Sequence, residues 1–182
     1  MRTAFVTVSL SLYLTKIASD TFVFIFSDRR AELLSLSNNK FSGSIREGFK
    51  DSVLDTLDLG QNLLTGTIPA TLFDVPTIRL VYFSNNKLIG GLPANYGFAE
   101  KLRDLYVDGN MLQGPIPVIA PGQLPNLSEF LVQGNELTGT MPESVCLLLT
   151  ESVLEDLWAD CELVTGVAEV ECSCCTQCTF EG

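Results

Sequence analysis

The sequence of 182 residues contains no histidine. This absence excludes Ser-His and Cys-His nucleophile pairs and every metal site that uses an imidazole ligand. No other nucleophile is recognisable, so we expect a protein that is not an enzyme and that needs no cofactor. The formal net charge of −11 also argues against nucleic acid as a partner, because a polyphosphate binds a basic face.

Basic residues are missing from the second part of the chain. All eleven Lys and Arg lie at or before Arg103, where nine acidic residues give a net charge of +2, whereas thirteen acidic residues from Asp104 onward give −13. Either this acidity only keeps the protein soluble, or it forms a face suited to a basic partner. No run of about 20 apolar residues follows the N-terminal region, so no transmembrane span is predicted.

A repeat with a period of 23 to 25 residues occupies most of the chain. It is anchored by asparagines that are separated by 23, 24, 24 and 25 residues, namely Asn39, Asn62, Asn86, Asn110 and Asn135. Apolar residues stand three, five and eight positions before each asparagine and two after it, and glycine always stands four after it. The shared pattern is L-x-x-L-x-L-x-x-N-x-L-x-G-x-I-P. We interpret the five asparagines as structural residues.

Each part of this pattern has a physical reason. The alternation in Leu57-Asp58-Leu59 predicts a short strand with one buried face. An asparagine amide can bond backbone groups that the following turn leaves unpaired, and the glycine permits a backbone conformation that a Cβ would oppose. One repeat cannot bury its apolar face alone, so stacked copies are needed to form a continuous core.

The pattern resembles the plant-type extracellular leucine-rich repeat over residues 31 to about 162. The resemblance implies a mostly β α/β repeat fold: a leucine-rich-repeat solenoid with a short parallel sheet on its concave face. We assign five clear repeats to residues 31–153, and a terminal degenerate repeat with a cap to residues 154–182. In this cap Leu157 and Ala159 take the buried strand positions, and Glu162 stands where asparagine would be.

All six cysteines lie at this C-terminal end: Cys146, Cys161, Cys172, Cys174, Cys175 and Cys178. Their even number and their confinement to the cap predict disulfides formed in an oxidising compartment. A zinc site is the alternative, although the spacing is poorer than two C-x-x-C pairs. Six cysteines allow fifteen pairings, and the sequence does not choose among them. Together with Leu154–Cys161, the tail resembles the C-terminal cap of leucine-rich-repeat proteins of diatoms and related algae, some of which look receptor-like.

Residues 1–30 allow two interpretations. A basic start followed by a moderately apolar stretch from Ala4 to Leu14 fits a signal peptide. Alternatively, Leu10, Leu12 and Ile17 fit a decayed repeat, in which case the chain is a piece of a longer protein. The sequence also contains a single N-glycosylation sequon, at Asn126-Leu-Ser128.

The repeat also predicts which side chains line the concave face, because strand neighbours point in opposite directions. We expect a partner to contact the C-terminal half of this face, through Tyr82, Tyr106, Leu131, Asp104, Asp108 and Glu129. The two tyrosines occupy equivalent positions on adjacent strands, so their rings are expected about 5 Å apart. Asp104 and Glu129 should repel each other, and a Lys or Arg of the partner, or a calcium ion, would relieve that repulsion.

The resulting functional prediction is an extracellular module that recognises a protein or peptide with a basic surface, because the cations of such a partner would complement these carboxylates. The resemblance allows two other functions: inhibition of a secreted hydrolase, and a structural, glycan-binding role in a cell wall or matrix. The predicted location is extracellular, either as a secreted protein or as part of a membrane protein's outer region.

Overall fold

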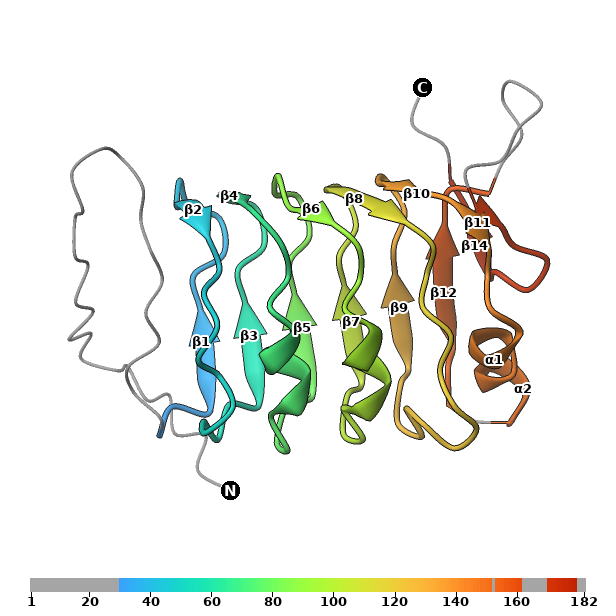
Figure 1. Ribbon diagram of the computed structural model, residues 1–182, viewed down its shortest axis with the longest axis horizontal. Helices are drawn as coiled ribbons and strands as arrows, with labels where there is room; N and C mark the ends of the chain where they lie inside the picture. The colour runs from blue at the N-terminus through green and yellow to red at the C-terminus, as the bar shows by residue number, and fades with distance from the viewer. Residues whose placement is uncertain (1–29, 152, 162–169, 180–182) are drawn as a thin grey trace.

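The computed structural model describes residues 30–151, 153–161 and 170–179, and shows a single row of parallel strands along the long axis of the molecule (Figure 1). The sheet has seven strands in the order β1-β3-β5-β7-β9-β12-β14. Their bounds are Leu33–Ser35, Thr56–Asp58, Leu80–Tyr82, Asp104–Tyr106, Glu129–Leu131, Asp156–Ala159 and Gln177–Cys178. The predicted repeat therefore produces the predicted sheet. The proposed signal peptide or decayed repeat of residues 1–30 lies outside the described residues except for Arg30.

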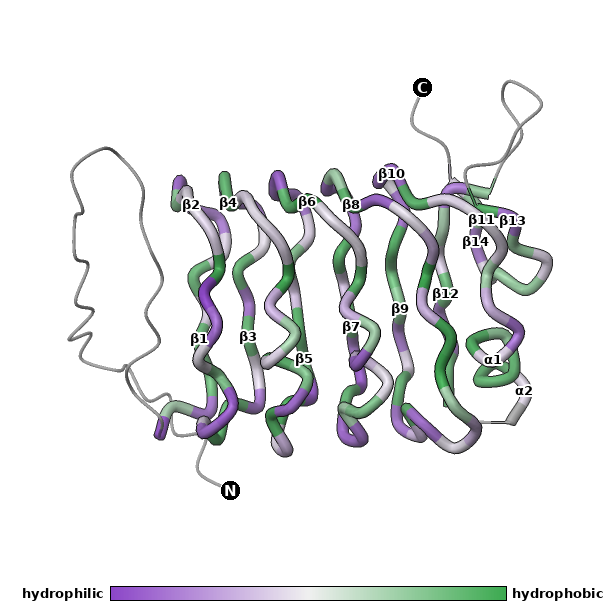
Figure 2. Tube along the Cα trace, viewed as in Figure 1, coloured by the Kyte–Doolittle hydropathy of each residue, from purple (hydrophilic) through white to green (hydrophobic). Residues whose placement is uncertain are grey.

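The strands pair in the register that the asparagine spacing predicts. Leu57 of β3 pairs with Val81 of β5, which pairs with Leu105 of β7, and all three side chains are fully buried. The residues on either side of each one point to the other face of the sheet. Hydrophobic stretches, drawn in green, recur along the row of main strands (Figure 2).

Short strands also pair along the rim where the main strands end, which the sequence did not predict. They form three further sheets of two or three strands, all parallel (Figure 1). Their bounds are β2 Ser42–Ser44, β4 Leu63–Thr65, β6 Ile89–Gly90, β8 Met111–Gly114, β10 Glu136–Leu137, β11 Gly139–Thr140 and β13 Val170–Glu171. Each repeat is thus hydrogen-bonded to its neighbour at two places.

One face of the main sheet is covered by short helices. They are the 3₁₀ turns η1 (Ala70–Asp74) and η2 (Ala94–Phe98) and the helices α1 (Glu143–Cys146) and α2 (Leu148–Glu151). Between them and the strands lies one continuous core. Its largest fully buried side chains include Tyr96, Phe73, Phe83 and Phe130. The opposite, concave face of the sheet remains available to a partner.

An asparagine ladder runs through the stack, as predicted. The Nδ2 of Asn86 donates to the carbonyl oxygens of Phe83 and of Leu59, which belongs to the preceding repeat, and Oδ1 accepts from the Leu64 amide. Equivalent bonds are made at the other three buried positions, Asn62, Asn110 and Asn135. Asn39 differs, because it is exposed and its side-chain Nδ2 donates to the carbonyls of Leu36 and Ser37 in its own turn.

The motif glycines have the backbone conformation that the pattern requires. Gly66 has a φ of +77° and Gly90 a φ of +79°. A Cβ at Gly90 would also lie 2.9 Å from the Thr67 side chain. These glycines therefore allow the chain to turn between the asparagine and the apolar residue that follows.

The cap ends the stack with a carboxylate. In earlier repeats the backbone N–H of the asparagine donates to a backbone carbonyl of the next repeat, as from Asn86 to Gly109. At the last position the backbone N–H of Asn135 donates instead to Oδ2 of Asp160. Asp160 is buried, and its Oδ1 accepts from the Thr179 hydroxyl. Asp160, directly after β12 in the terminal repeat, thus takes the place of that backbone carbonyl. Glu162, the position predicted to replace asparagine, lies outside the described residues.

Three disulfides use all six cysteines, and two of them tie the tail to the elements before it. Cys146 of α1 bonds Cys174, Cys161 bonds Cys178 of β14, and Cys172 bonds Cys175. The zinc alternative is thereby left without free thiolates. The staple at Cys178 holds β14 against β12, so the cysteine-rich tail supplies the seventh strand, which the sequence pattern did not predict.

Candidate functional site

The candidate site is the concave face of β5, β7, β9 and β12. Strand register aligns two columns of outward side chains on these strands. The first column contains Leu80, Asp104, Glu129 and Asp156, and the second contains Tyr82, Tyr106, Leu131 and Trp158. These columns are the ones that the repeat predicts. We call the second column the aromatic strip.

The aromatic strip is half-buried along its whole length. The ring centroids of Tyr82 and Tyr106 are 4.8 Å apart, as predicted, with the ring planes inclined by 63°. This edge-to-face arrangement is favourable for aromatic pairs. Leu131 and Trp158 continue the strip on the next two strands. The strip therefore offers a contiguous, partly exposed apolar surface.

Each tyrosine hydroxyl donates to a carboxylate on the following strand. The Tyr82 hydroxyl lies 2.8 Å from Oδ2 of Asp104, and the Tyr106 hydroxyl donates to Glu129. The expected repulsion between Asp104 and Glu129 is thus relieved within the chain, so it does not by itself require a partner or a calcium ion. Burial, and then the bond to its carboxylate, raises the pKa of each tyrosine, which keeps both hydroxyls protonated as donors.

Asp104 lies deeper than the sequence suggests. Only 6% of the residue is exposed, and its Oδ1 lies 3.5 Å from Nε of Arg103 but has no hydrogen-bond partner. The sequence placed Asp104 among the residues that contact a partner. In the structure Asp104 accepts the hydrogen bond of Tyr82 and is buried, whereas Glu129 is half-exposed.

Asp108 lies beside the strip, at the end of β7. Its carboxylate accepts a 2.6 Å bond from the Ser84 hydroxyl, and burial raises its pKa in spite of that bond. On the N-terminal strands the equivalent polar groups bond one another, because Ser35 and Ser37 both donate to Asp58. The aromatic side chains of these columns therefore lie only on the C-terminal half of the concave face within the described residues.

The last members of these columns, Asp156 and Trp158, lie beside the cap. The Trp158 indole N–H donates to Asp156 two residues earlier, and Trp158 pairs in register with Gln177 of β14. Trp158 thus lies at the end of the strip beside the cap, and its partial exposure makes it a further candidate contact. Within the described ranges, no group of three or more carboxylates and thiols is placed to hold a metal ion.

Comparisons with known proteins agree with this geometry. The Leucine Rich Repeat family model matches residues 31–52. No curated protein matches the chain. Several solved structures do, among them ectodomains of Arabidopsis receptor kinases with bound ligands.

The first is the ectodomain of GASSHO1/SCHENGEN3 from Arabidopsis thaliana in complex with CASPARIAN STRIP INTEGRITY FACTOR 2, with a TM-score of 0.65 and 31% identity over 72% of this chain and 16% of that one. The second is the Arabidopsis HAESA ectodomain with an extended IDA peptide hormone, with a TM-score of 0.64 and 31% identity over 69% of this chain and 21% of that one. The third is the BIR2 ectodomain from Arabidopsis thaliana, with a TM-score of 0.55 and 33% identity over 61% of this chain and 58% of that one.

The fold is thus a leucine-rich-repeat solenoid, and the chain is similar to plant receptor-kinase ectodomains. It spans about a sixth to a fifth of the length of the two liganded ectodomains. The three disulfides are consistent with an extracellular location. Among the residues that the structure describes, no helix is long and apolar enough to cross a membrane.

Proposed function

We propose that this protein is an extracellular recognition module that binds a protein or peptide on the C-terminal half of its concave face. The observation that carries the proposal is the aromatic strip, because its half-exposed side chains, three of them aromatic, form a contiguous surface over four adjacent strands. Aromatic side chains of this kind commonly anchor interfaces.

The strip is also held in place before any partner arrives. Tyr82 and Tyr106 contact each other, and each hydroxyl is fixed by a carboxylate on the next strand. Binding to such a surface loses little side-chain entropy, because the rings have little freedom left to lose. This organisation favours the strip over the other exposed apolar residues as the anchor of an interface.

The surrounding charge points to a basic partner segment. Glu129, Asp108 and Asp156 border the strip, and no Lys or Arg occurs in the chain after Arg103. A carboxylate has about four lone-pair sites, so Glu129 can accept from a partner cation while it accepts from Tyr106. A Lys or Arg over the tyrosine rings would also gain a cation–π interaction.

The liganded neighbours support this class of function. The HAESA ectodomain binds a peptide hormone, and the GASSHO1/SCHENGEN3 ectodomain binds CASPARIAN STRIP INTEGRITY FACTOR 2. By likeness, the present chain is proposed to be a receptor-like module with a peptide or protein ligand. The resemblance of its cap to algal proteins, and the division at residues 153 and 154, remain predictions of the sequence.

Affinity capture from native extracellular fluid tests the proposal, with the oxidised full chain as bait. A matched bait carries Tyr106→Ala, which removes one ring of the strip, and a second carries Phe98→Ala, which removes an exposed ring of η2 on the other side of the sheet. We expect a partner that the parent and Phe98→Ala baits retain and the Tyr106→Ala bait loses. A partner retained by Tyr106→Ala but lost by Phe98→Ala would refute the assignment to the concave face.

A further inference from the structure

A groove lies along the rim where the main strands begin. It has a volume of about 410 Å³. One row of its lining consists of the residues directly before β5, β7, β9 and β12, which are Arg79, Arg103, Ser128 and Glu155. A second row lies two positions earlier in three of these repeats and consists of Lys101, Asn126 and Val153. The groove thus crosses four repeats, and the concave-face proposal does not use it.

The chain's single glycosylation sequon opens into this groove. Leu127, its middle residue, is fully buried in the core, whereas Asn126 and Ser128 on either side line the groove. Asn126 is exposed, and its Nδ2 donates a 2.8 Å bond to the carbonyl oxygen of Glu100. An amide nitrogen carries two hydrogens, so the second remains for substitution.

We propose that Asn126 carries an N-linked glycan whose first sugars lie in this groove. The bond forms between Nδ2 of Asn126 and the anomeric carbon of an oligosaccharide carried on a lipid pyrophosphate. The anomeric carbon–oxygen bond breaks, the lipid pyrophosphate leaves with the electron pair, and Nδ2 loses one proton. The remaining N–H keeps its bond to Glu100. The three disulfides independently indicate passage through an oxidising compartment, where this modification takes place.

The lining of the groove suits a sugar. Hydroxyl and acetamido groups need both donors and acceptors, and Lys101 and Arg103 supply donors while Glu155 supplies an acceptor. The Arg103 side chain is 61% exposed, so most of its guanidinium remains free to bond. Val153, which is 51% exposed, offers an aliphatic contact for the less polar face of a ring. These groups belong to the repeats on both sides of Asn126.

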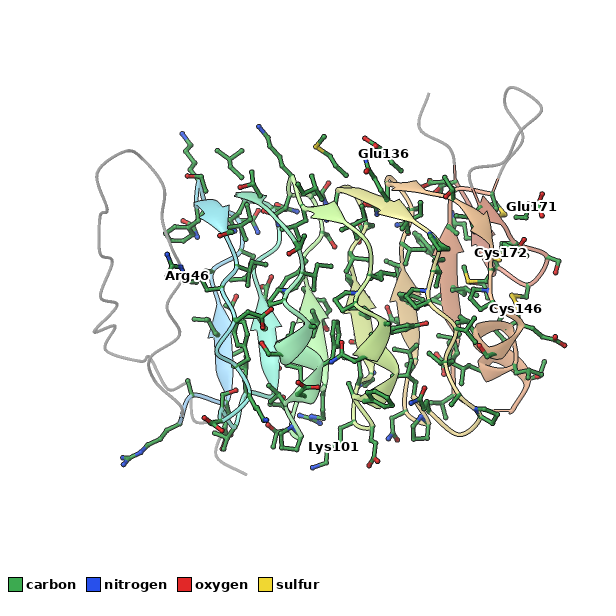
Figure 3. All side chains as sticks on the ribbon, viewed as in Figure 1. Arg46, Lys101, Glu136, Cys146, Glu171 and Cys172 are labelled. Carbon is green, nitrogen blue, oxygen red and sulfur yellow. A yellow bond between two sulfur atoms is a disulfide. The ribbon has the colours of Figure 1, made fainter. Side chains whose placement is uncertain are left out.

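A glycan here would also restrict where partners approach. Lys101 marks the rim with the groove, whereas Glu136 lies at the opposite rim with the short strands (Figure 3). The glycan would cover the first rim across the repeats that carry the aromatic strip. It would leave the concave face and the rim of β6, β8 and β10 uncovered.

Expression of the full chain behind a cleavable secretion signal in eukaryotic cells tests the modification. The parent and Ser128→Thr should carry the glycan mass, and enzymatic removal in heavy-oxygen water should mark Asn126. Ser128→Ala keeps the asparagine but should lack that mass. Intact mass without reduction confirms that each secreted variant has its three disulfides. Secreted, oxidised parent without a glycan at Asn126 would overturn the proposal, whatever the concave face binds.

The position of the sugars is tested on the same material with an amine-reactive reagent. Labelling of Lys101 should be slower in the glycosylated parent than after enzymatic removal of the glycan. Lys87, an exposed residue near the opposite rim, is the internal control and should react equally in both. Asn126→Gln controls for the aspartate that enzymatic removal creates. Equal labelling of Lys101 with and without the glycan would overturn its placement in the groove.

Discussion

At the scale of single residues, the stack depends most on its buried asparagines, because each one bonds the backbones of two repeats. We expect Asn86→Ala to lower the free energy of unfolding by about 1–3 kcal/mol, since it leaves the buried Leu64 amide without its acceptor and removes one donor from each of the Leu59 and Phe83 carbonyls. Urea denaturation measures the change. Asn39→Ala is the matched control, because the Asn39 side chain is exposed and its Nδ2 donates to carbonyls of its own turn. Equal stability of the Asn86 variant and the parent would contradict a structural ladder.

The two tyrosine–carboxylate bonds should differ in their contribution to stability. Tyr82→Phe removes the donor to the buried Asp104, so we expect it to cost about 1–3 kcal/mol. Tyr106→Phe leaves a half-exposed Glu129 that water can reach, so its cost should be smaller. Both variants keep the ring contact. A larger loss of unfolding free energy for Tyr106→Phe than for Tyr82→Phe in urea denaturation would mean that the buried Asp104 does not depend on the Tyr82 hydroxyl.

Alkaline pH gives a second measure of the same bonds. The folded state raises the pKa of Tyr82 and Tyr106 above the ordinary value of about 10. The stabilisation from the protonated hydroxyls is therefore complete below about pH 10 and is lost as the pH rises further. The urea midpoint of the parent should fall in that range, and the fall should be smaller in Tyr82→Phe.

Residue-scale predictability has a clear physical limit. The asparagine ladder and the aromatic strip were predictable, because both follow from position within a regular repeat. The burial of Asp104 was not predictable, because it depends on the particular side chains that flank it. These are Tyr82 on the preceding strand and Arg103, the residue directly before Asp104. A repeat motif specifies which face a residue occupies and does not specify how deeply its neighbours cover it.

At the scale of elements, the cap is held by covalent staples that differ in the length of chain they enclose. Replacing Cys161 and Cys178 by serine opens a link over 17 residues, which the chain-entropy argument values at about 3 kcal/mol. We expect faster amide exchange in β12 and β14 and unchanged exchange in β3 and β5, because a solenoid is stabilised mainly by contacts between neighbouring repeats. Hydrogen exchange with mass detection reads out both regions.

The control for this experiment is the link between Cys172 and Cys175, which spans only three residues. Serine at both of these positions should change exchange in β12 and β14 less, because a shorter closed loop restricts the unfolded chain less. Uniform acceleration across all strands in either variant would show that the chain unfolds as one cooperative unit and would contradict a local role for the staples.

The elements that escaped sequence-based prediction share a cause. The rim strands such as β6 and β10 have two residues each, too few for a period to appear in the sequence. Strand β14 and the disulfide pairing depend on the path by which the tail returns to β12, and cysteine spacing does not define that path. The main strands were predictable because five copies repeat one pattern.

At the scale of the whole molecule, negative charge is concentrated in the C-terminal part of the chain, where it favours encounter with a basic partner. The thirteen acidic residues after Arg103 have no basic residue among them, and several border the aromatic strip. Such a field speeds association with a basic partner and acts mostly on the on-rate, whereas buried aromatic anchors act mostly on the off-rate. The two contributions can therefore be separated with single substitutions.

With a captured partner immobilised, Glu129→Gln should lower the on-rate at low salt, and the difference from the parent should shrink at physiological ionic strength, where charges are screened over about 8 Å. Glu136→Gln makes the same charge change at the rim of β10, away from the strip, and should have a smaller effect. Tyr106→Ala should instead raise the off-rate at either salt concentration, because it removes a half-buried ring from the centre of the strip. Equal on-rate effects of Glu129→Gln and Glu136→Gln would mean that net charge, and not the acidic border of the strip, guides the encounter. An unchanged off-rate for Tyr106→Ala would remove the strip from the interface.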